Sequence, residues 1–201
     1  MKRILLFFFS LYSCLFALGQ GFGAQVHVAA NFSQVDGDQL GGYNKLGLNA
    51  GLQINRTIKE DWEGAFEIRY SMKGAKKVID PEAPATFTLK LNYDYVEVPF
   101  LLKYTKYDKI TPFAGVSVGA NVRNQREENG IVSNEQALNF MELGFHFGGN
   151  YHLTDKWGID LRHSYSLVSV RDFPIVVNSP TWFGRAGWYN RLFTAGFTYT
   201  P

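Results

Sequence analysis

Four residues with metal-binding side chains lie close together in the sequence: Glu142, His146, His152 and Asp160. Carboxylates and imidazoles are common ligands of divalent metals. The residues around them alternate between polar and apolar types, as in a β-strand, where each residue advances the chain by about 3.3 Å. The four side chains would then be strung along roughly 30 Å of strand. One ion cannot collect them, so the sequence predicts no metal site, and we expect no cofactor.

The segment from Arg162 to Ser166 reads RHSYS and places a histidine beside a serine. A nucleophilic serine needs a histidine within hydrogen-bond reach. On a strand, however, His163 and Ser164 point to opposite faces. No carboxylate that could orient His163 is evident on its face. We therefore expect no catalytic residues, with a hydrolase kept as an alternative.

The elements that position these residues are strands. Residues 46–55 alternate between Leu, Ala or Ile on one face and Gly, Asn or Gln on the other. This period of two is that of a strand, not a helix. Similar patterns predict eight strands, near residues 22–32, 44–56, 62–73, 88–104, 110–123, 138–153, 157–170 and 188–199.

The connections between the predicted strands alternate in length. Three are short, at residues 57–61, 105–109 and 154–156, and four are long, at 33–42, 74–86, 124–137 and 171–187. Antiparallel neighbours then place every short turn at one end and every long loop at the other. This is the layout of outer-membrane barrels, with short periplasmic turns and long extracellular loops. The sequence predicts an all-β fold, an eight-stranded antiparallel closed transmembrane β-barrel.

A soluble, lipocalin-like ligand-binding barrel is the main structural alternative, because it too would close. The polar face separates the two, since here it is rich in Gly, Ala, Ser and Asn, which suit a narrow interior. Aromatic residues also cluster near strand ends, as in the girdles at membrane interfaces. They are Trp62, Tyr104, Tyr151, Trp157, Trp188 and Tyr199. We favour the lipid-facing interpretation.

The predicted lumen face carries many charged and titratable side chains. They are Glu63, Glu67, Arg69, Lys73, Glu97, Lys103, Arg123, Glu142, His146, Asp160 and Arg162. We interpret them as a network of salt bridges and hydrogen bonds that fills a narrow barrel, because an unpaired buried charge is costly. A small polar channel is the alternative.

The stretch YVEVPFLLKY, residues 95–104, puts a carboxylate and a proline inside an apolar strand. If Phe100 faces lipid, Glu97 and Pro99 face the lumen. Pro99 donates no ladder hydrogen bond, so a bulge or a missing bond is expected there. Residues 88–94 are out of phase with the rest, so either a bulge shifts the register or they stand above the bilayer.

The same stretch resembles the PorT-like, porin-family outer-membrane β-barrel proteins of Bacteroidota. The resemblance also includes FEIRYSMKGAKK, TPFAGVSVGANV and GIDLRHSYSLVSV, in that order, and it spans nearly all of residues 20–201. His163 departs from it, where a tyrosine is expected, as does the terminal Pro201. The resemblance implies the fold and the location, while members of the family differ in role.

The first nineteen residues have the layout of a signal peptide. Lys2 and Arg3 precede an apolar run that ends at Ala17-Leu18-Gly19, so we expect cleavage after Gly19. The single cysteine, Cys14, lies in this segment. Residues 20–201 would then form one barrel domain without a disulfide, with 18 basic and 18 acidic side chains. This balance gives no indication of nucleic-acid binding.

The long loops are the remaining candidate for binding. The loop at residues 171–187 and the residues next to it contain aromatic side chains that we expect to be exposed, namely Phe173, Trp182, Phe183, Trp188 and Tyr189. Such side chains mark binding sites for a surface protein or ligand. We expect a structural or interaction protein of the outer membrane, in contact with its lipid. The alternatives are a narrow-channel or accessory role in transport or secretion, and a lipid A-modifying enzyme. The sequence does not fix the oligomeric state.

Overall fold

The structure is a computed structural model that describes residues 21–38, 40–77, 88–134, 138–172 and 187–201. In this part of the chain it contains nine strands. They are β1 Phe22–Asp36, β2 Lys45–Lys59, β3 Trp62–Lys76, β4 Leu89–Tyr104, β5 Ile110–Glu128, β6 Ile131–Asn134, β7 Met141–His152, β8 Trp157–Ser166 and β9 Tyr189–Tyr199. None of the described residues belongs to a helix long and apolar enough to cross a membrane.

Eight of these strands form a closed antiparallel ring. The order around it is β4-β3-β2-β1-β9-β8-β7-β5, and β5 pairs back with β4. The seam between β1 and β9 is continuous from the pair Val26 and Tyr199 to the pair Asp36 and Tyr189. The predicted eight-stranded, closed β-barrel is therefore confirmed.

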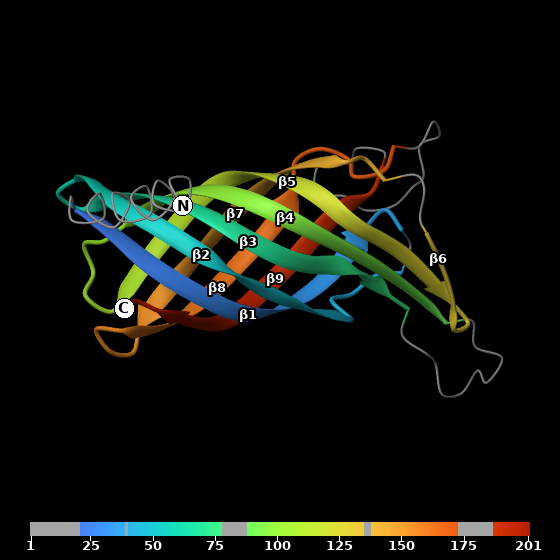
Figure 1. Cartoon of the computed structure of the whole chain (residues 1–201), viewed down its shortest axis with the longest axis horizontal. Coiled ribbons are helices and arrows are strands. Elements are labelled where there is room, and N and C mark those ends of the chain that lie inside the picture. The colour runs from blue at the N-terminus through green and yellow to red at the C-terminus, as the bar shows by residue number, and fades with distance from the viewer. Residues whose placement is uncertain (1–20, 39, 78–87, 135–137, 173–186) are drawn as a thin grey trace, which may run out of the picture.

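The strand β6 lies outside this ring and was not predicted. The short turns and the C-terminus lie at one end of the barrel, and β6 lies at the other (Figure 1). The first part of β5 pairs with β7 and its last four residues pair with β6. The sequence predicts a long loop over residues 124–137, and β6 corrects that prediction. The sequence signal for this hairpin was the dipeptide Asn129-Gly130, because Asn-Gly favours tight hairpins. Both residues have positive φ in the structure, 50° and 83°.

The outer wall of the barrel is apolar and the inner wall is polar. Leu52, Ile68 and Phe100 face outward and expose 62%, 53% and 52% of their surface. On the alternate positions of β3, Glu67 and Arg69 face inward and expose 1% and 2%. A barrel surrounded by water has the opposite polarity, so the soluble, lipocalin-like alternative is wrong.

Aromatic pairs mark the wall at the short-turn end. The ring centroids of Trp62 and Tyr104 are 4.8 Å apart, and those of Trp157 and Tyr199 are 4.9 Å apart. This is the placement of an interfacial girdle. Trp188 is an exception to the predicted girdle, because it is buried at the opposite end of the barrel.

The side chains of β4 alternate between inward and outward along the whole strand. The polarity of the two faces, however, differs between the lower part of the strand, near the short turns, and the upper part, near the long loops. In its lower part, Phe100 and Leu102 face outward. In its upper part, Leu91 and Tyr93 face inward and are fully buried, while Lys90 is partly exposed. Such an exchange is expected where the surroundings change from lipid to water, because apolar side chains leave water. Residues 89–93 thus match the expectation of a segment above the bilayer.

The pairing of β4 with its two neighbouring strands is irregular at two places. The register with β5 shifts between Asp94 and Tyr95, and Tyr95 lies two residues before Glu97. The ladder with β3 has no pairs at Val98 and Pro99, although pairing continues on both sides of them. The local gap at Pro99 was expected from its missing N–H group.

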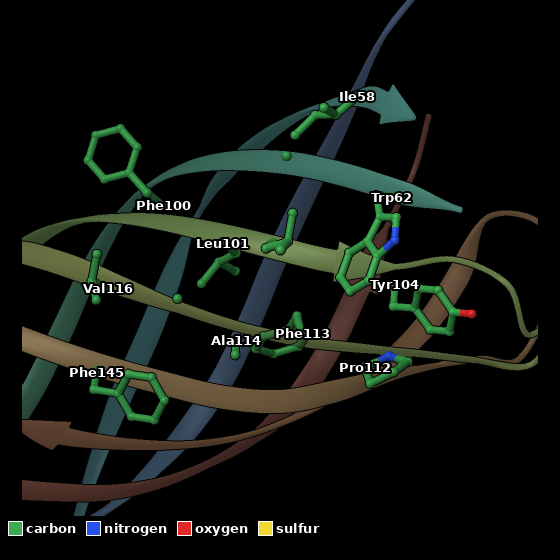
Figure 2. Close-up of a pocket in the computed structure, with 13 residues that line it drawn as sticks. Ile58, Trp62, Phe100, Leu101, Tyr104, Pro112, Phe113, Ala114, Val116 and Phe145 are labelled. Carbon is green, nitrogen blue, oxygen red and sulfur yellow. The ribbon is translucent and has the colours of Figure 1, made fainter. Parts of the chain in front are cut away.

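The outer wall also carries a hollow of about 830 Å³ near the short-turn end (Figure 2). It forms because Gly64 and Ala114 contribute little side chain among larger neighbours such as Trp62, Phe100 and Phe145. Its lining is almost entirely hydrocarbon. The hollow is therefore part of the lipid-facing surface and not a site for a polar ligand.

Gly115 is next to Ala114 on β5 but faces the interior, where β4 approaches closely. A Cβ atom on Gly115 would lie 2.8 Å from the Cα atom of Leu101 and would also meet the carbonyl oxygen of Phe100. Backbone atoms of a paired strand cannot move away without disturbing the ladder. This position therefore requires glycine for steric reasons.

We expect Gly115→Val to destabilise the folded barrel by about 1–3 kcal/mol, because it overpacks the interior against backbone. Ala114→Val is the matched control, since it adds two carbons beside the hollow and should change stability by less than about 1 kcal/mol. The measurements are the midpoint of urea unfolding in detergent micelles and the gel-mobility shift on boiling. Equal effects of the two substitutions would contradict the inward assignment of Gly115.

Candidate functional site

The central layer of the barrel interior is built on Glu67. Arg162, on the opposite wall, donates to both of its carboxylate oxygens, at 2.9 and 3.0 Å. Arg69 lies 3.1 Å from the same carboxylate. All three side chains are at most 2% exposed. The guanidinium of Arg162 also stacks 4.6 Å from the ring centroid of Phe113, which fills the space beside it.

A second charged layer lies nearer the long-loop end and is built on Lys73. Its ammonium lies 2.5 Å from Glu97 and 2.8 Å from Glu142. Ser166 donates to one oxygen of Glu142, and Asn190 donates to the other at 3.3 Å. These five residues come from β3, β4, β7, β8 and β9. The layer therefore connects strands that are not neighbours in the ring.

His146 lies between the two layers with both ring nitrogens occupied. Its Nδ1 lies 2.7 Å from the hydroxyl of Ser164, and its Nε2 lies 2.7 Å from the hydroxyl of Ser117. A histidine does contact Ser164, but it is His146 and not the adjacent His163. In a catalytic triad, the histidine contacts the nucleophilic serine on one side and an orienting carboxylate on the other. Here a hydroxyl occupies each side, so the carboxylate is missing. His146 is also only 1% exposed. This arrangement fixes His146 within the interior.

His163 lies on the other face of β8, as its position in the strand indicates. Its Nε2 lies 3.2 Å from the hydroxyl of Tyr43, and its ring centroid is 5.1 Å from that of Phe147. It makes no described contact with Ser164. The adjacent His-Ser pair in the sequence is therefore not a catalytic pair in space.

The remaining predicted lumen residues lie toward the short-turn end, with one exception. Asp160 lies 3.5 Å from Arg162. Lys103 donates to the amide oxygen of Gln53 at 3.0 Å, while the amide nitrogen of Gln53 donates to Glu67 at 2.9 Å. Glu63 accepts a hydrogen bond from Asn55 at 3.0 Å and is partly exposed.

Arg123 is the exception and corrects the predicted lumen set. Its side chain is 50% exposed, and it lies 3.5 Å from Asp94 at the long-loop end. The cause is the register shift of β5, in which Arg123 pairs with Asp94 while Asn121 pairs with Tyr95. The extra residue between them moves Arg123 out of the alternation that the sequence suggested.

His27 is an interior residue that was not among the predicted lumen residues. Its Nε2 lies 3.2 Å from Arg69 and 3.2 Å from the side-chain oxygen of Asn49. In the sequence, His27 lies between Val26 and Val28, and this alternation could have indicated that it faces the interior. No group of three or more His, Cys, Asp or Glu residues within the described ranges is placed to hold a metal ion.

An apolar cluster closes the interior at the long-loop end. It consists of Val35, Ala75, Leu91, Tyr93, Tyr95, Val170 and Trp188. Trp188 and Tyr189 were predicted to bind a partner, but only 8% and 4% of their surfaces are exposed. They are packing residues, because the start of β9 turns them into the structure. Phe173, Trp182 and Phe183 lie outside the described residues.

A small pocket lies at the same end of the molecule, where β3 ends and β4 begins. Its volume is about 260 Å³, and it is lined by Lys76, Lys77, Thr88, Leu89, Lys90 and Glu127. Lys90 lies 3.7 Å from Glu127, with both side chains well exposed. Three lysines and one glutamate thus line the pocket.

A closed ring of eight antiparallel strands, with an apolar outer wall and a polar inner wall, defines an integral β-barrel of the outer-membrane type. The sequence matches the family described as outer membrane protein beta-barrel domain over residues 16–172. The chain belongs to this family and is a protein of the bacterial outer membrane.

Comparison with solved structures agrees with this assignment. Neisserial surface protein A has 18% identity and a TM-score of 0.53, and the match covers 90% of this chain and 98% of that chain. Ail, the attachment invasion locus protein of Yersinia pestis, has 13% identity and a TM-score of 0.55, covering 89% and 99%. At these identities the likeness shows the fold alone. No curated protein matches the chain in sequence.

We expect Glu67→Gln to destabilise the barrel by about 3–5 kcal/mol, because it removes the carboxylate that two buried guanidinium groups share. Arg162→Met should cost less, since Glu67 keeps Arg69. Glu127→Gln makes the same change in an exposed ion pair and should cost at most about 1 kcal/mol. Urea unfolding in micelles gives the order. A Glu127 variant as unstable as the Glu67 variant would contradict the central role of this layer.

The two charged layers and the apolar cluster together leave little free path through the interior. We therefore expect the purified protein to give no steady ohmic current in planar bilayers, measured from current–voltage curves against empty bilayers. A reproducible unit conductance would contradict the filled interior and favour the narrow-channel alternative.

Proposed function

We propose that the protein is a surface interaction protein of the outer membrane that binds an anionic ligand at its extracellular end. The observation that carries this proposal is the pocket of Lys76, Lys77 and Lys90 at the outer ends of the projecting strands β3 and β4. The barrel is the anchor, and it holds this pocket beyond the lipid.

The pocket is built on paired backbone, so its lysines have a defined spacing. The N–H of Lys77 donates to the carbonyl of Leu89 at 2.9 Å. The N–H of Thr88 donates to the side-chain oxygen of Asn129 at 2.9 Å, and the N–H of Asn129 donates back to the carbonyl of Thr88 at 3.0 Å. These bonds connect β3, β4 and the β5–β6 turn around the pocket. Ammonium groups bind sulfate and phosphate oxygens as point charges.

A fold neighbour supports this class of ligand. Ail of Yersinia pestis has been solved in complex with sucrose octasulfate, a heparin analogue, at 11% identity and a TM-score of 0.54 to this chain. Such identity carries no residue correspondence, so the choice of a sulfated or phosphorylated ligand rests on the lysine pocket itself.

Strand β6 favours a second candidate, the binding of an extended protein segment. All four of its residues are exposed, and Ile131 and Val132 expose 74% and 57% of their surface. Among the described residues, the strand pairs with β5 alone. An unpaired edge of this kind can accept an added strand.

We further propose that residues 1–19 are a signal peptide cleaved before Gln20 and that the barrel acts without catalysis. The finer assignment to the PorT-like proteins of Bacteroidota rests on the resemblance around Glu97 and Pro99. An accessory role in transport or secretion and a lipid A-modifying activity remain the alternatives to ligand binding.

The proposal predicts that sucrose octasulfate binds to the protein in micelles, as measured by isothermal titration calorimetry. The double substitution Lys76→Ala and Lys90→Ala should weaken binding about ten-fold or more, since each charged hydrogen bond contributes about 1.5 kcal/mol or more. Raising the salt concentration should also weaken binding, because exposed charges are screened.

Lys106→Ala provides the matched control, because Lys106 is an exposed lysine in a short turn at the opposite end. It should leave binding unchanged. Binding that falls equally with Lys106→Ala would indicate general charge attraction and reject the pocket. Absence of binding to the wild-type protein would reject the proposed ligand class.

A further inference from the structure

The interior opens at the short-turn end into a polar vestibule of about 530 Å³. Its lining includes the amides of Gln25, Gln53 and Asn55 and the hydroxyls of Thr111 and Thr200. The apolar cluster closes the opposite end of the interior. The vestibule therefore communicates with the periplasmic side alone, far from the extracellular lysine pocket.

Lys103 and Glu63 lie at the same level of the vestibule wall without forming an ion pair. They are direct partners across β3 and β4, and both line the vestibule. Yet Glu63 accepts from Asn55 at 3.0 Å, and Lys103 donates to Gln53 at 3.0 Å. Within the described part of the chain, no carboxylate lies within 4.0 Å of the Lys103 ammonium. The two charges are held apart by separate amide partners.

The Lys103 ammonium is an incompletely satisfied buried donor. The residue is only 7% exposed, and an ammonium has three N–H donors. The side chain of Gln53 is its one described hydrogen-bond partner. A buried charge with unused donors is costly unless an acceptor reaches it, and the vestibule is the space from which an acceptor can come.

The other charges of the vestibule have the opposite sign. Asp108 and Asp155, in two of the short turns, line it together with Glu63. A simple anion would meet Lys103 but would be repelled by three carboxylates. A simple cation would satisfy the carboxylates but would leave the buried ammonium without an acceptor. A ligand that carries both a carboxylate and an ammonium satisfies both halves.

We propose that this vestibule binds a small zwitterion, an amino acid or a short peptide, from the periplasm. The ligand carboxylate accepts from Lys103, and the ligand ammonium donates to Glu63 and faces the turn aspartates. The amides and hydroxyls of the lining supply hydrogen bonds to a peptide group. The ligand enters and leaves the site through one opening, on the periplasmic side. This binding goes beyond the extracellular function proposed above.

The test uses the full barrel in detergent micelles and glycylglycine as the probe, with calorimetric titration as the readout. Two blocked probes, N-acetyl-glycylglycine and glycylglycinamide, lack the ammonium and the carboxylate charge respectively. We expect saturable binding of glycylglycine, and binding of each blocked probe weaker by about ten-fold or more, since each loses a charge-assisted hydrogen bond.

The variants Lys103→Met and Glu63→Gln should weaken glycylglycine binding to a similar extent. The controls Lys106→Met and Glu60→Gln change charges at the same end that do not line the vestibule, so they should bind as the wild type does. The gel shift on boiling shows which variants fold. The blocked probes test the proposal on the unaltered protein even if a variant does not fold.

No saturable binding of glycylglycine at millimolar concentrations would overturn the proposal. Equal binding of the blocked probes would overturn it as well, as would a folded Lys103→Met variant with unchanged affinity. Because the anionic-ligand test uses the opposite end of the barrel, failure there would leave this result unaffected.

Discussion

The constraint on which this structure depends is that lipid offers no hydrogen bond to a sheet edge. An unpaired backbone group in hydrocarbon costs several kcal/mol, so the sheet must close, and β5 returns to β4 to close it. Closure by eight strands fixes a narrow interior. It also sends every second side chain into that interior, away from both lipid and water. Because the outward positions are apolar, the polar positions are the ones enclosed.

Most of the enclosed charges are tolerated here because they lie beside a charge of opposite sign, and Lys103 is the exception. Of the predicted lumen set, the buried cations are Arg69, Lys73, Lys103 and Arg162, and the buried anions are Glu67, Glu97, Glu142 and Asp160. Two separate layers result, one on Glu67 and one on Lys73. Both cross the barrel, so they act as braces between distant strands. The same braces fill the space that a channel would need, which favours an anchor over a pore.

The two ends of the barrel differ because their surroundings differ. At the extracellular end, β3 and β4 extend beyond the lipid. Their inward side chains Ala75, Leu91 and Tyr93 join an apolar cluster, while Lys76 and Lys90 face outward. At the periplasmic end, the strands stop near the aromatic girdle, and the interior remains polar and open. The proposed ligand sites follow from this difference. The outward lysines suit the proposed anionic ligand, and the open vestibule suits the proposed zwitterion.

The alternation of residue types and of loop lengths determined the strand number, the closure and the polarity of the two walls, because these properties are local or follow from chain order. Tertiary structure alone decided which charges meet. Arg162 binds Glu67 from 95 residues away, and Ser164 contacts His146 and not its neighbour His163. Alternation gives the face of a side chain but not its height in the barrel, which depends on the stagger of the strands. A single extra residue in β5 therefore sufficed to place Arg123 outside the network that its sequence position predicted.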